Sequence, residues 1–224
     1  KEFLKTNELI YSSRKMNMAI NMVTYHNATF AFAPYDTYWK FLKKLSTTQL
    51  LGNQTLGYPN LPYIDAIIKE TMRLHPRIPM IMRKEIEDCV VNGNKIPKDS
   101  IVCVNIWVMG RDPNIWEVLL EFKVERFLED ERSSIDIKGH NFELFPYGSG
   151  RRGCPHMPLA LRELLTIIGA LIQCFEWKIF DSKDHAHAIT LINMDKRPGL
   201  TAPKANDLIV VSIARLNPTP FLHV

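Results

Sequence analysis

The chain has 224 residues, of which 46% are hydrophobic and 23% are charged, so it can bury a core as one large domain or two small ones. Its formal net charge of +4 is small and its basic residues are scattered, which argues against a nucleic-acid-binding surface. The start, Lys1 to Lys5, lacks the apolar core of a signal peptide. The most apolar later stretch, 164–175, is shorter than the roughly 20 residues that a bilayer requires, so we expect no membrane span.

The four cysteines, at positions 89, 103, 154 and 174, include no C-x-x-C pair, and no histidines accompany them at the spacing of a zinc site. A disulfide framework or a zinc module would show such spacing. We therefore expect all four cysteines to be reduced, in a compartment that faces the cytosol.

Residues 1–56 are predicted to be mainly helical with an internal loop. Between residues 35 and 51 the apolar positions recur at helical spacing, which places Trp39 and Lys43 one turn apart on the same face. By themselves these two residues indicate only a half-buried aromatic ring beside a solvated lysine. The glycine- and proline-rich stretch 52–62 is typical of a linker or junction.

A helix is predicted from about Leu61 to His75, because Pro76 stops it and its apolar residues share one face. Glu70 and Arg73 lie three residues apart on this helix and can form an ion pair. If exposed, such a pair stabilises a helix by only about 0.2–0.5 kcal/mol.

The middle of the chain is predicted to be rich in strands. Segments 84–91 and 101–104 flank Asn92-Gly93, a strong hairpin signal. A short helix is expected at 105–110, a turn at 111–114 and an irregular segment at 116–130. A long helix after residue 159 has a wide apolar stripe and is expected to be buried. Further strands are expected at 190–193 and 208–214, so the fold class is mainly α with a minor β portion (α+β).

The most informative stretch runs from Phe145 to Leu159, where a glycine-rich loop with two arginines leads through Cys154 into the long helix. The helix N-terminus and the charges of Arg151 and Arg152 favour the thiolate form of this cysteine. Glycines at 148, 150 and 153 let the backbone bend sharply and approach a flat ligand. Cys154 could be a haem-iron thiolate, a catalytic nucleophile or a small buried side chain.

Three motifs in this order resemble the cytochrome P450 family of haem-thiolate monooxygenases: Glu70-Thr-Met-Arg73, Glu125-Arg126-Phe127 and the cysteine loop. The loop fits F-x-x-G-x-R-x-C-x-G at Gly150, Arg152 and Cys154. The resemblance implies that Cys154 is the axial ligand of the iron in haem b. It also implies that Glu70, Arg73 and Arg126 form a buried charge network beneath the haem.

Further cofactor-binding residues follow from the same resemblance. Trp39 and Lys43 match the W-x-x-x-R/K pattern of a helix that contacts a haem propionate. Arg83 matches the basic residue on the other propionate side, and a carboxylate partner suits Lys43, Arg83 and Arg152 alike.

More narrowly, segments 31–41, 45–53 and 199–208 resemble the plant flavonoid branch of flavone synthase II, flavanone 2-hydroxylase and licodione synthase. This implies oxidation of a flavanone-like substrate with dioxygen and electrons from an NADPH-cytochrome P450 reductase. The family location is the cytosolic face of the endoplasmic reticulum; the chain as given has no anchor and would be cytosolic. Substrate-facing residues by resemblance are 22–30, Pro79 to Met82, and Leu200-Thr201.

The sequence also departs from the family. A first block, 1–56, resembles the early helices and substrate loop, and a second, 57–224, resembles the haem-thiolate core, with a junction near 56–59. The central helix with its acid-Thr pair is absent between them, so no catalytic residue is assigned; the membrane anchor is also absent. His156 stands where the family has glycine, and is expected to crowd the entry into the helix. The alternatives are a catalytically inactive remnant and a haem-binding module without monooxygenase turnover.

Overall fold

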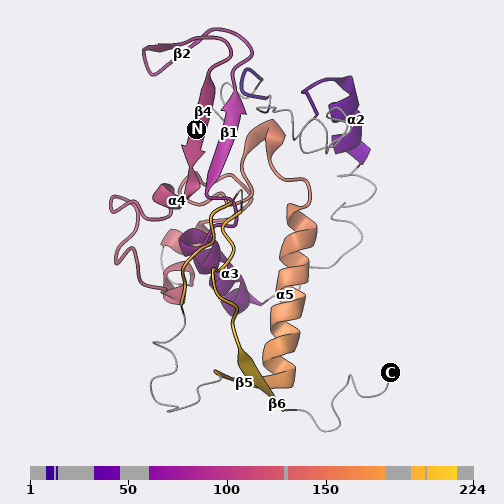
Figure 1. Ribbon diagram of the computed structural model, residues 1–224, viewed down its shortest axis with the longest axis vertical. Coiled ribbons are helices and arrows are strands. Elements are labelled where there is room, and N and C mark those ends of the chain that lie inside the picture. The colour runs from indigo at the N-terminus through magenta and orange to yellow at the C-terminus, as the bar shows by residue number, and fades with distance from the viewer. Residues whose placement is uncertain are drawn as a thin grey trace.

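The computed structural model describes residues 9–12, 14, 33–45, 61–128, 131–179, 193–199 and 201–215. Figure 1 shows a long helix, α5, alongside the shorter α3, with small two-stranded sheets at either end. The helices and strands, in chain order, are α2 (Thr37–Leu45), α3 (Pro62–Leu74), β1 (Met80–Lys84), β2 (Cys89–Val91), β3 (Asn94–Ile96), β4 (Ile101–Asn105), α4 (Ile106–Met109), η4 (Val124–Phe127), η5 (Glu131–Ser134), η6 (Gly150–Arg152), α5 (Met157–Cys174), β5 (Phe175–Ile179) and β6 (Val210–Ala214).

Helix α3 confirms the prediction for 61–75. It begins with Pro62, whose fixed φ suits the first helical turn, and it ends at Leu74 before Pro76. Its buried residues include the apolar Ala66, Ile68 and Leu74. Helix α2 likewise confirms the first part of the helix expected at 35–51; residues 46–51 lie outside the described residues.

The hairpin at Asn92-Gly93 is confirmed, but its strands are shorter than expected. Asn92 and Gly93 both have positive φ, 49° and 79°, which is the geometry of a tight hairpin turn between β2 and β3. The segment 84–91 is not one strand. It bends after Lys84, so β1 pairs with β4 while β2 pairs with β3.

The short helix expected at 105–110 is confirmed as α4. The side chain of Asn105 accepts a hydrogen bond from the Val108 amide at 3.1 Å, which caps its first turn. The turn expected at 111–114 follows, closed by the bond from the Trp116 amide to the Asp112 carbonyl at 2.8 Å.

The main core lies between α3, α5 and the irregular segment that carries η4. Trp116, 1% exposed, is its largest buried apolar side chain and lies against Phe127 with ring centroids 5.9 Å apart. Buried members of this core are Ala66, Ile68, Trp116, Val124, Phe127, Ile135, Ile137, Leu144, Leu161 and Leu165. A smaller cluster of Ile81, Ile106 and Phe145 lies under the β1–β4 pair. Phe145 joins this second cluster to the cysteine loop.

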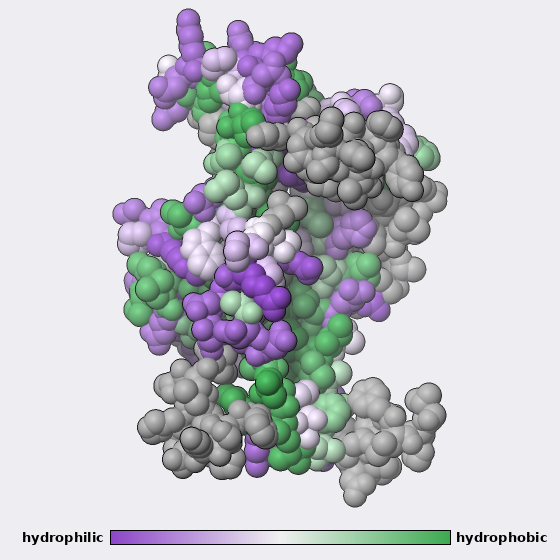
Figure 2. Space-filling model, viewed as in Figure 1, coloured by the Kyte–Doolittle hydropathy of each residue, from purple (hydrophilic) through white to green (hydrophobic). Residues whose placement is uncertain are grey.

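Helix α5 forms as predicted, but the expectation that it is buried is wrong. Only Leu161, Leu165 and Cys174 are buried along its length, whereas Ile167 is 55% exposed and Ile172 is 44% exposed. Figure 2 shows hydrophobic surface over its lower end, in the view of Figure 1. The reason is that α5 is apolar on several faces while α3 covers one of them. Contrary to the expectation of no span, α5 is long and apolar enough to cross a membrane, by length and composition only.

The strand expected at 208–214 is confirmed as β6, which pairs antiparallel with β5. Strand β5 was not expected, because residue 175 was assigned to the preceding helix. Residues 190–192 of the other expected strand lie outside the described residues, as does the junction at 56–59, so the division into 1–56 and 57–224 stays a prediction.

Candidate functional site

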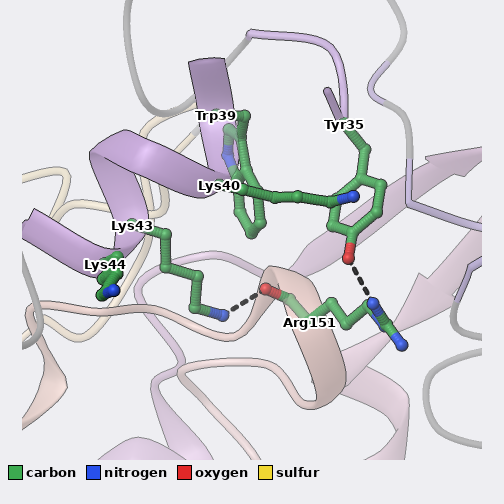
Figure 3. A pocket seen from close by; sticks show the side chains of 6 residues that line it. All are labelled: Tyr35, Trp39, Lys40, Lys43, Lys44 and Arg151. Atoms are coloured by element: carbon green, nitrogen blue, oxygen red, sulfur yellow. Dashed lines mark hydrogen bonds between the residues drawn. The ribbon is translucent and has the colours of Figure 1, made fainter. Parts of the chain in front are cut away.

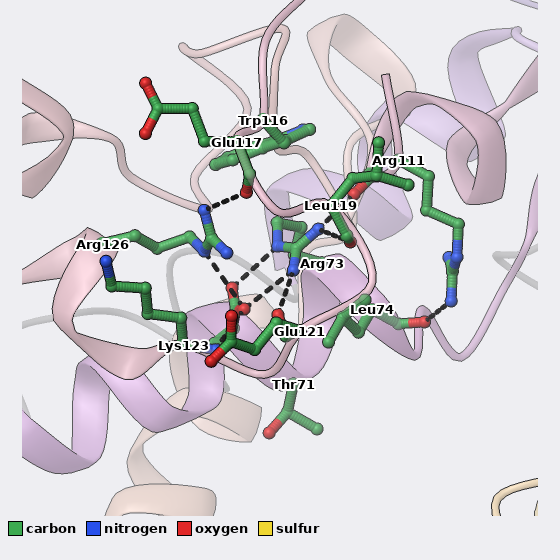
Figure 4. A network of polar contacts seen from close by, with 12 residues as sticks. Thr71, Arg73, Leu74, Arg111, Trp116, Glu117, Leu119, Glu121, Lys123 and Arg126 are labelled. Atoms are coloured by element: carbon green, nitrogen blue, oxygen red, sulfur yellow. Dashed lines mark hydrogen bonds and ion pairs between the residues drawn. The ribbon is translucent and has the colours of Figure 1, made fainter. Parts of the chain in front are cut away.

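Glu70 is the centre of a buried ion-pair network that we call the carboxylate network: Glu70, Arg73 and Arg126. Glu70 and Arg73 are both 0% exposed, and Arg73 binds the carboxylate with two parallel bonds of 2.8 Å, from Nε and Nη2. The Nε of Arg126 lies 3.2 Å from the same carboxylate. Figure 4 shows the side chains of Arg73 and Arg126 in this network. Glu70, Arg73 and Arg126 therefore form a buried ion-pair network in the structure, and its relation to a haem stays a prediction.

The network also holds the irregular segment that precedes η4. Arg73 Nη1 donates to the carbonyls of Gly110 at 2.6 Å and Leu119 at 2.8 Å, and the Lys123 amide donates to Glu70 at 2.9 Å. Gly110 is required here, because a Cβ at this position would lie 2.2 Å from the Arg73 carbonyl oxygen. These hydrogen bonds hold the main chain between Gly110 and Lys123 against the carboxylate network.

The cysteine loop is built from tight backbone turns. Gly148 and Gly150 have positive φ, 72° and 69°, which side chains with a Cβ rarely adopt. The Cys154 amide donates to the Tyr147 carbonyl at 3.0 Å, and Ser149 Oγ donates to the Gly139 carbonyl at 2.7 Å. These bonds hold Cys154 partly buried, three residues before α5 begins at Met157.

Beside this loop lies a group of buried guanidinium groups that we call the arginine cluster: Arg14, Arg83 and Arg152. Arg83 is 2% exposed and Arg152 is 7% exposed. Burial, followed by the charges of Arg14 and Arg152, lowers the pKa of Arg83 to about 9. Burial and the charge of Arg14 lower the pKa of Arg152 to about 10, against smaller opposing effects of Tyr35 and Asp36. The three cations therefore repel one another in a site largely removed from water.

The arginine cluster has donors without acceptors. Arg14 Nε and Arg152 Nη1 are buried and have no hydrogen-bond partner within the part of the chain that the structure describes. Other donors of the cluster bond to neutral carbonyls: Arg83 Nη1 donates to Met82 at 3.2 Å and Arg152 Nη2 donates to Ala33 at 2.8 Å. Such a group favours an anion with several acceptor oxygens. Sequence reasoning identified Arg83 and Arg152 but missed Arg14, whose polar neighbours in the sequence give no sign of burial.

Trp39 and Lys43 lie at the edge of this region. Trp39 is 2% exposed, with the Arg152 guanidinium 4.3 Å and the Lys43 Nζ 5.2 Å from its ring centroid. Their shared helix face is therefore confirmed. Lys43, however, donates to the carbonyl of Arg151, as Figure 3 shows, and does not join the arginine cluster. A pocket of about 320 Å³ at this place is lined by Tyr35, Trp39, Lys40, Lys43, Lys44 and Arg151.

The crowding expected at His156 is not observed. Its φ of −85° is ordinary for any residue, and its side chain is exposed. Of the residues expected to face a substrate, Met80 and Met82 are 43% and 38% exposed on β1, whereas Ile81 points into the small core. Segment 22–30 and Leu200 lie outside the described residues.

All four cysteines are free, as expected. The part of the chain that the structure describes contains no cluster of three or more His, Cys, Asp or Glu side chains.

Comparisons with known proteins agree with this arrangement. Residues 57–201 match the family model described as cytochrome P450. The chain is 41% identical over 434 aligned residues to cytochrome P450 93B16 of Glycine max, which covers 98% of this chain and 82% of that protein. It is 51% identical over 175 residues to cytochrome P450 93B2 of Gerbera hybrida, an alignment that covers 75% of this chain and 33% of that protein. It is 42% identical over 163 residues to a 2-hydroxyisoflavanone synthase of Glycine max, which covers 70% of this chain and 31% of that protein.

Two solved structures share the fold. Retinoic acid-bound cyanobacterial CYP120A1 has a TM-score of 0.56 at 26% identity, over 68% of this chain and 33% of that one. A zebra fish cytochrome P450 with abiraterone has a TM-score of 0.58 at 28% identity, over 70% of this chain and 35% of that one. Apart from cytochrome P450 93B16, the chain spans about a third of the length of each of these proteins. The chain belongs to the cytochrome P450 family, whose cofactor is a haem held by a cysteine thiolate.

Proposed function

We propose that Cys154 supplies the thiolate for the haem iron and that the arginine cluster binds the haem carboxylates. The observation that carries this proposal is the arginine cluster itself. Its guanidinium groups lie beside the cysteine loop, and none of the hydrogen bonds described above joins them to an anion. Two carboxylates would neutralise charge that now lowers the pKa of Arg83 and Arg152, and would accept from the unpartnered Arg14 Nε and Arg152 Nη1. The donor set therefore fits the cofactor of the family.

Within this proposal each part of the chain has a distinct task. The bound haem supplies the chemistry of oxygen activation. Cys154 holds the iron, and the bonds from Cys154 and Ser149 to loop carbonyls keep the thiolate in place. Trp39, under the Arg152 guanidinium, excludes water from the carboxylate end. Gly150 permits the left-handed turn that leads to Cys154. The carboxylate network acts at a distance, by fixing the segment before η4.

The family is one of monooxygenases, and we propose a flavanone-like substrate for this chain. The relatives include a 2-hydroxyisoflavanone synthase, whose name supports a flavonoid-type substrate. The exposed Met80 and Met82 on β1 offer apolar surface to such a ligand. Thr201 and Pro79 are the other described candidates for contact with it. NADPH-cytochrome P450 reductase is the proposed electron donor, at the cytosolic face of the endoplasmic reticulum.

The ligation of haem can be tested by expressing the full chain with haem supplied and recording the reduced carbon-monoxide difference spectrum. We expect a thiolate-type band in the unaltered chain and its loss in Cys154→Ala. Cys103→Ser is the matched control, since Cys103 is an exposed cysteine on β4 and should keep the band. Absence of the band in the unaltered chain, or its persistence in Cys154→Ala, contradicts the assignment.

A second function, a haem-binding remnant without turnover, is favoured by one observation. The alignment with cytochrome P450 93B16 extends over 434 residues, nearly twice the 224 residues of this chain, although 98% of the chain takes part in it. About half of the aligned positions thus have no counterpart here. We propose that the missing part includes the central oxygen-activating helix, for which the sequence has no acid-Thr motif.

Turnover separates the two functions. The haem-loaded chain is incubated with a flavanone such as naringenin, the reductase and NADPH, and the products are analysed. The remnant hypothesis predicts the thiolate-type band without product. Formation of an oxidised flavanone, absent in Cys154→Ala, supports the monooxygenase and refutes the remnant.

A further inference from the structure

A fully buried carboxylate, that of Glu85, lies outside the site described above. Glu85 directly follows β1 and is 0% exposed, and among the described residues neither of its carboxylate oxygens has a partner at ordinary hydrogen-bond distance. Its backbone is fixed, since its amide donates to Ser100 at 2.9 Å and its carbonyl accepts from Asp99 at 3.2 Å. The side chain is therefore held in the interior by the path of the main chain. Burying an unpaired charge is costly, and such a group normally takes up a cation or a proton.

Two further donor atoms lie next to this carboxylate. The Tyr11 hydroxyl is 3.0 Å from the Cys89 Sγ, and Tyr11 is 1% exposed while Cys89 is partly exposed at the start of β2. The bond from the Ile86 amide to the Ile10 carbonyl, 3.2 Å, fastens the Tyr11 segment to the loop between β1 and β2. The donors thus come from two chain segments that are already joined.

Glu85 acts directly on both neighbours. Burial, then the contacts with Cys89 and Glu85, raises the pKa of Tyr11. The Tyr11 hydrogen bond lowers the pKa of the Cys89 thiol, but burial and Glu85 outweigh it and raise the pKa overall. These effects are the ones expected of a negative charge beside the oxygen of Tyr11 and the sulfur of Cys89. A positive charge among the three atoms would relieve all of these unfavourable interactions.

We propose that Glu85, Cys89 and Tyr11 form a binding site for a thiophilic divalent cation of the zinc class. A sulfur donor combined with carboxylate and phenol oxygens suits zinc better than magnesium or calcium, which prefer oxygen alone. On binding, the Cys89 thiol releases its proton to solvent and a sulfur–metal bond forms. The carboxylate and the thiolate then balance the two positive charges of the ion. This site is independent of Cys154 and of haem.

The geometry requires only a small adjustment. In a tetrahedral zinc site, with Zn–S of about 2.3 Å and Zn–O of about 2.0 Å, the sulfur and oxygen ligands lie roughly 3.5 Å apart. The Tyr11 oxygen and the Cys89 sulfur are 3.0 Å apart, joined by the hydrogen bond that metal binding would replace. Partial exposure of Cys89 gives the ion a route of entry, and a water molecule can complete the coordination.

The test uses the purified full chain, stripped of metal, and zinc in competition with a chromophoric chelator. We expect one tight equivalent of zinc, with an X-ray absorption spectrum that shows a single sulfur among oxygen ligands. Cys89→Ser and Glu85→Gln should each weaken binding at least about tenfold. Cys103→Ser, which alters an exposed cysteine on the neighbouring β4, should bind as the unaltered chain does.

Thermal unfolding keeps the result interpretable if a variant folds poorly. Zinc should raise the melting temperature of the unaltered chain and of Cys103→Ser, and leave that of Glu85→Gln unchanged. Equal zinc affinity in the unaltered chain and in Cys89→Ser or Glu85→Gln overturns the proposal, as does a spectrum without sulfur. A melting temperature of the unaltered chain that zinc does not raise overturns it as well.

Discussion

Two buried groups of arginines in this chain have opposite surroundings. In the carboxylate network, Arg73 and Arg126 share the carboxylate of Glu70, and Arg73 also reaches three backbone carbonyls. In the arginine cluster, Arg14, Arg83 and Arg152 face one another, and two of their buried donors have no acceptor. Arg73, Arg126, Arg83 and Arg152 are all buried, so the main difference between the two groups is the presence of a carboxylate.

The difference separates what the chain needs for folding from what it needs for its cofactor. The carboxylate network contains a carboxylate of its own, shared by Arg73 and Arg126, so it does not depend on a ligand to supply an anion. The arginine cluster costs free energy until an anion arrives, because buried like charges repel one another. Removal of a charge should therefore have opposite signs in the two places.

The largest effect is expected from Glu70→Gln. This change leaves Arg73 and Arg126 as uncompensated buried charges, which typically costs about 3–5 kcal/mol in the free energy of unfolding. Urea denaturation followed by circular dichroism measures it. Asp65→Asn is the matched control on the same helix, since its pair with Lys69 is partly exposed and should contribute less than about 0.5 kcal/mol. Similar losses for both variants would mean that burial does not distinguish the two pairs.

A smaller effect of opposite sign is expected from Arg83→Met. In the haem-free chain, removal of one of three repelling cations should raise the free energy of unfolding by about 1–2 kcal/mol. In the haem-loaded chain the same change should speed the loss of haem to an acceptor protein. A haem-free chain that is destabilised by Arg83→Met as strongly as by Glu70→Gln would show that Arg83 already has an anion.

The pH dependence of stability reports on the charges around His75, which lies at the end of α3 next to the carboxylate network. Burial, then the charges of Lys196, Arg111 and Arg73, lowers the pKa of His75 to about 4, and Glu70 opposes them. The unfolded chain binds this proton below pH 6.5 and the folded chain only below about pH 4. Stability is therefore expected to fall as the pH decreases through this window.

Thermal unfolding between pH 7 and pH 4 tests this expectation. His75→Gln, which keeps a polar side chain but cannot be protonated, should show a flatter dependence than the unaltered chain. Identical slopes for the two proteins would assign the acid sensitivity to other groups.

The smallest effect is expected from Lys43→Met. Lys43 donates to the Arg151 carbonyl, so its loss should cost the haem-free chain about 1 kcal/mol or less. If Lys43 instead serves a haem carboxylate, as the sequence predicts, the variant should release haem faster while its haem-free stability stays the same. Lys40→Met, one turn earlier in the same pocket, is the control for a general loss of positive charge.

Local signals in the sequence were sufficient for several elements. Pro62 and Pro76 delimit α3, Asn92-Gly93 forms the hairpin turn, and Asn105 caps α4. Each of these signals acts over a few residues, so it needs no knowledge of tertiary structure. The charged motifs and the cysteine loop are likewise short, and their order along the chain indicated the family.

The remaining features depend on contacts between distant residues. Strand β5 exists because its partner β6 lies 31 or more residues further along the chain, from Val210 paired with Ile179 to Ala214 paired with Phe175. Arg14 comes close to Arg83 and Arg152 only in the folded chain. The residues next to Arg14 in the sequence therefore do not predict this contact. Glu70 and Arg73 have the spacing of an ordinary surface pair, and only the segment 110–126 folding over them makes them buried.

The open surface of α5 has a consequence for the life of the protein in a cell. Chaperones and proteases bind exposed apolar segments, and Ile167, Leu171 and Ile172 present such a segment in the folded chain. The abundance of the protein should then depend on how quickly this surface is covered after synthesis, more than on the free energy of unfolding. Replacing Ile167 with glutamate should lengthen the cellular half-life in a pulse-chase measurement while α3 and its ion pairs remain intact.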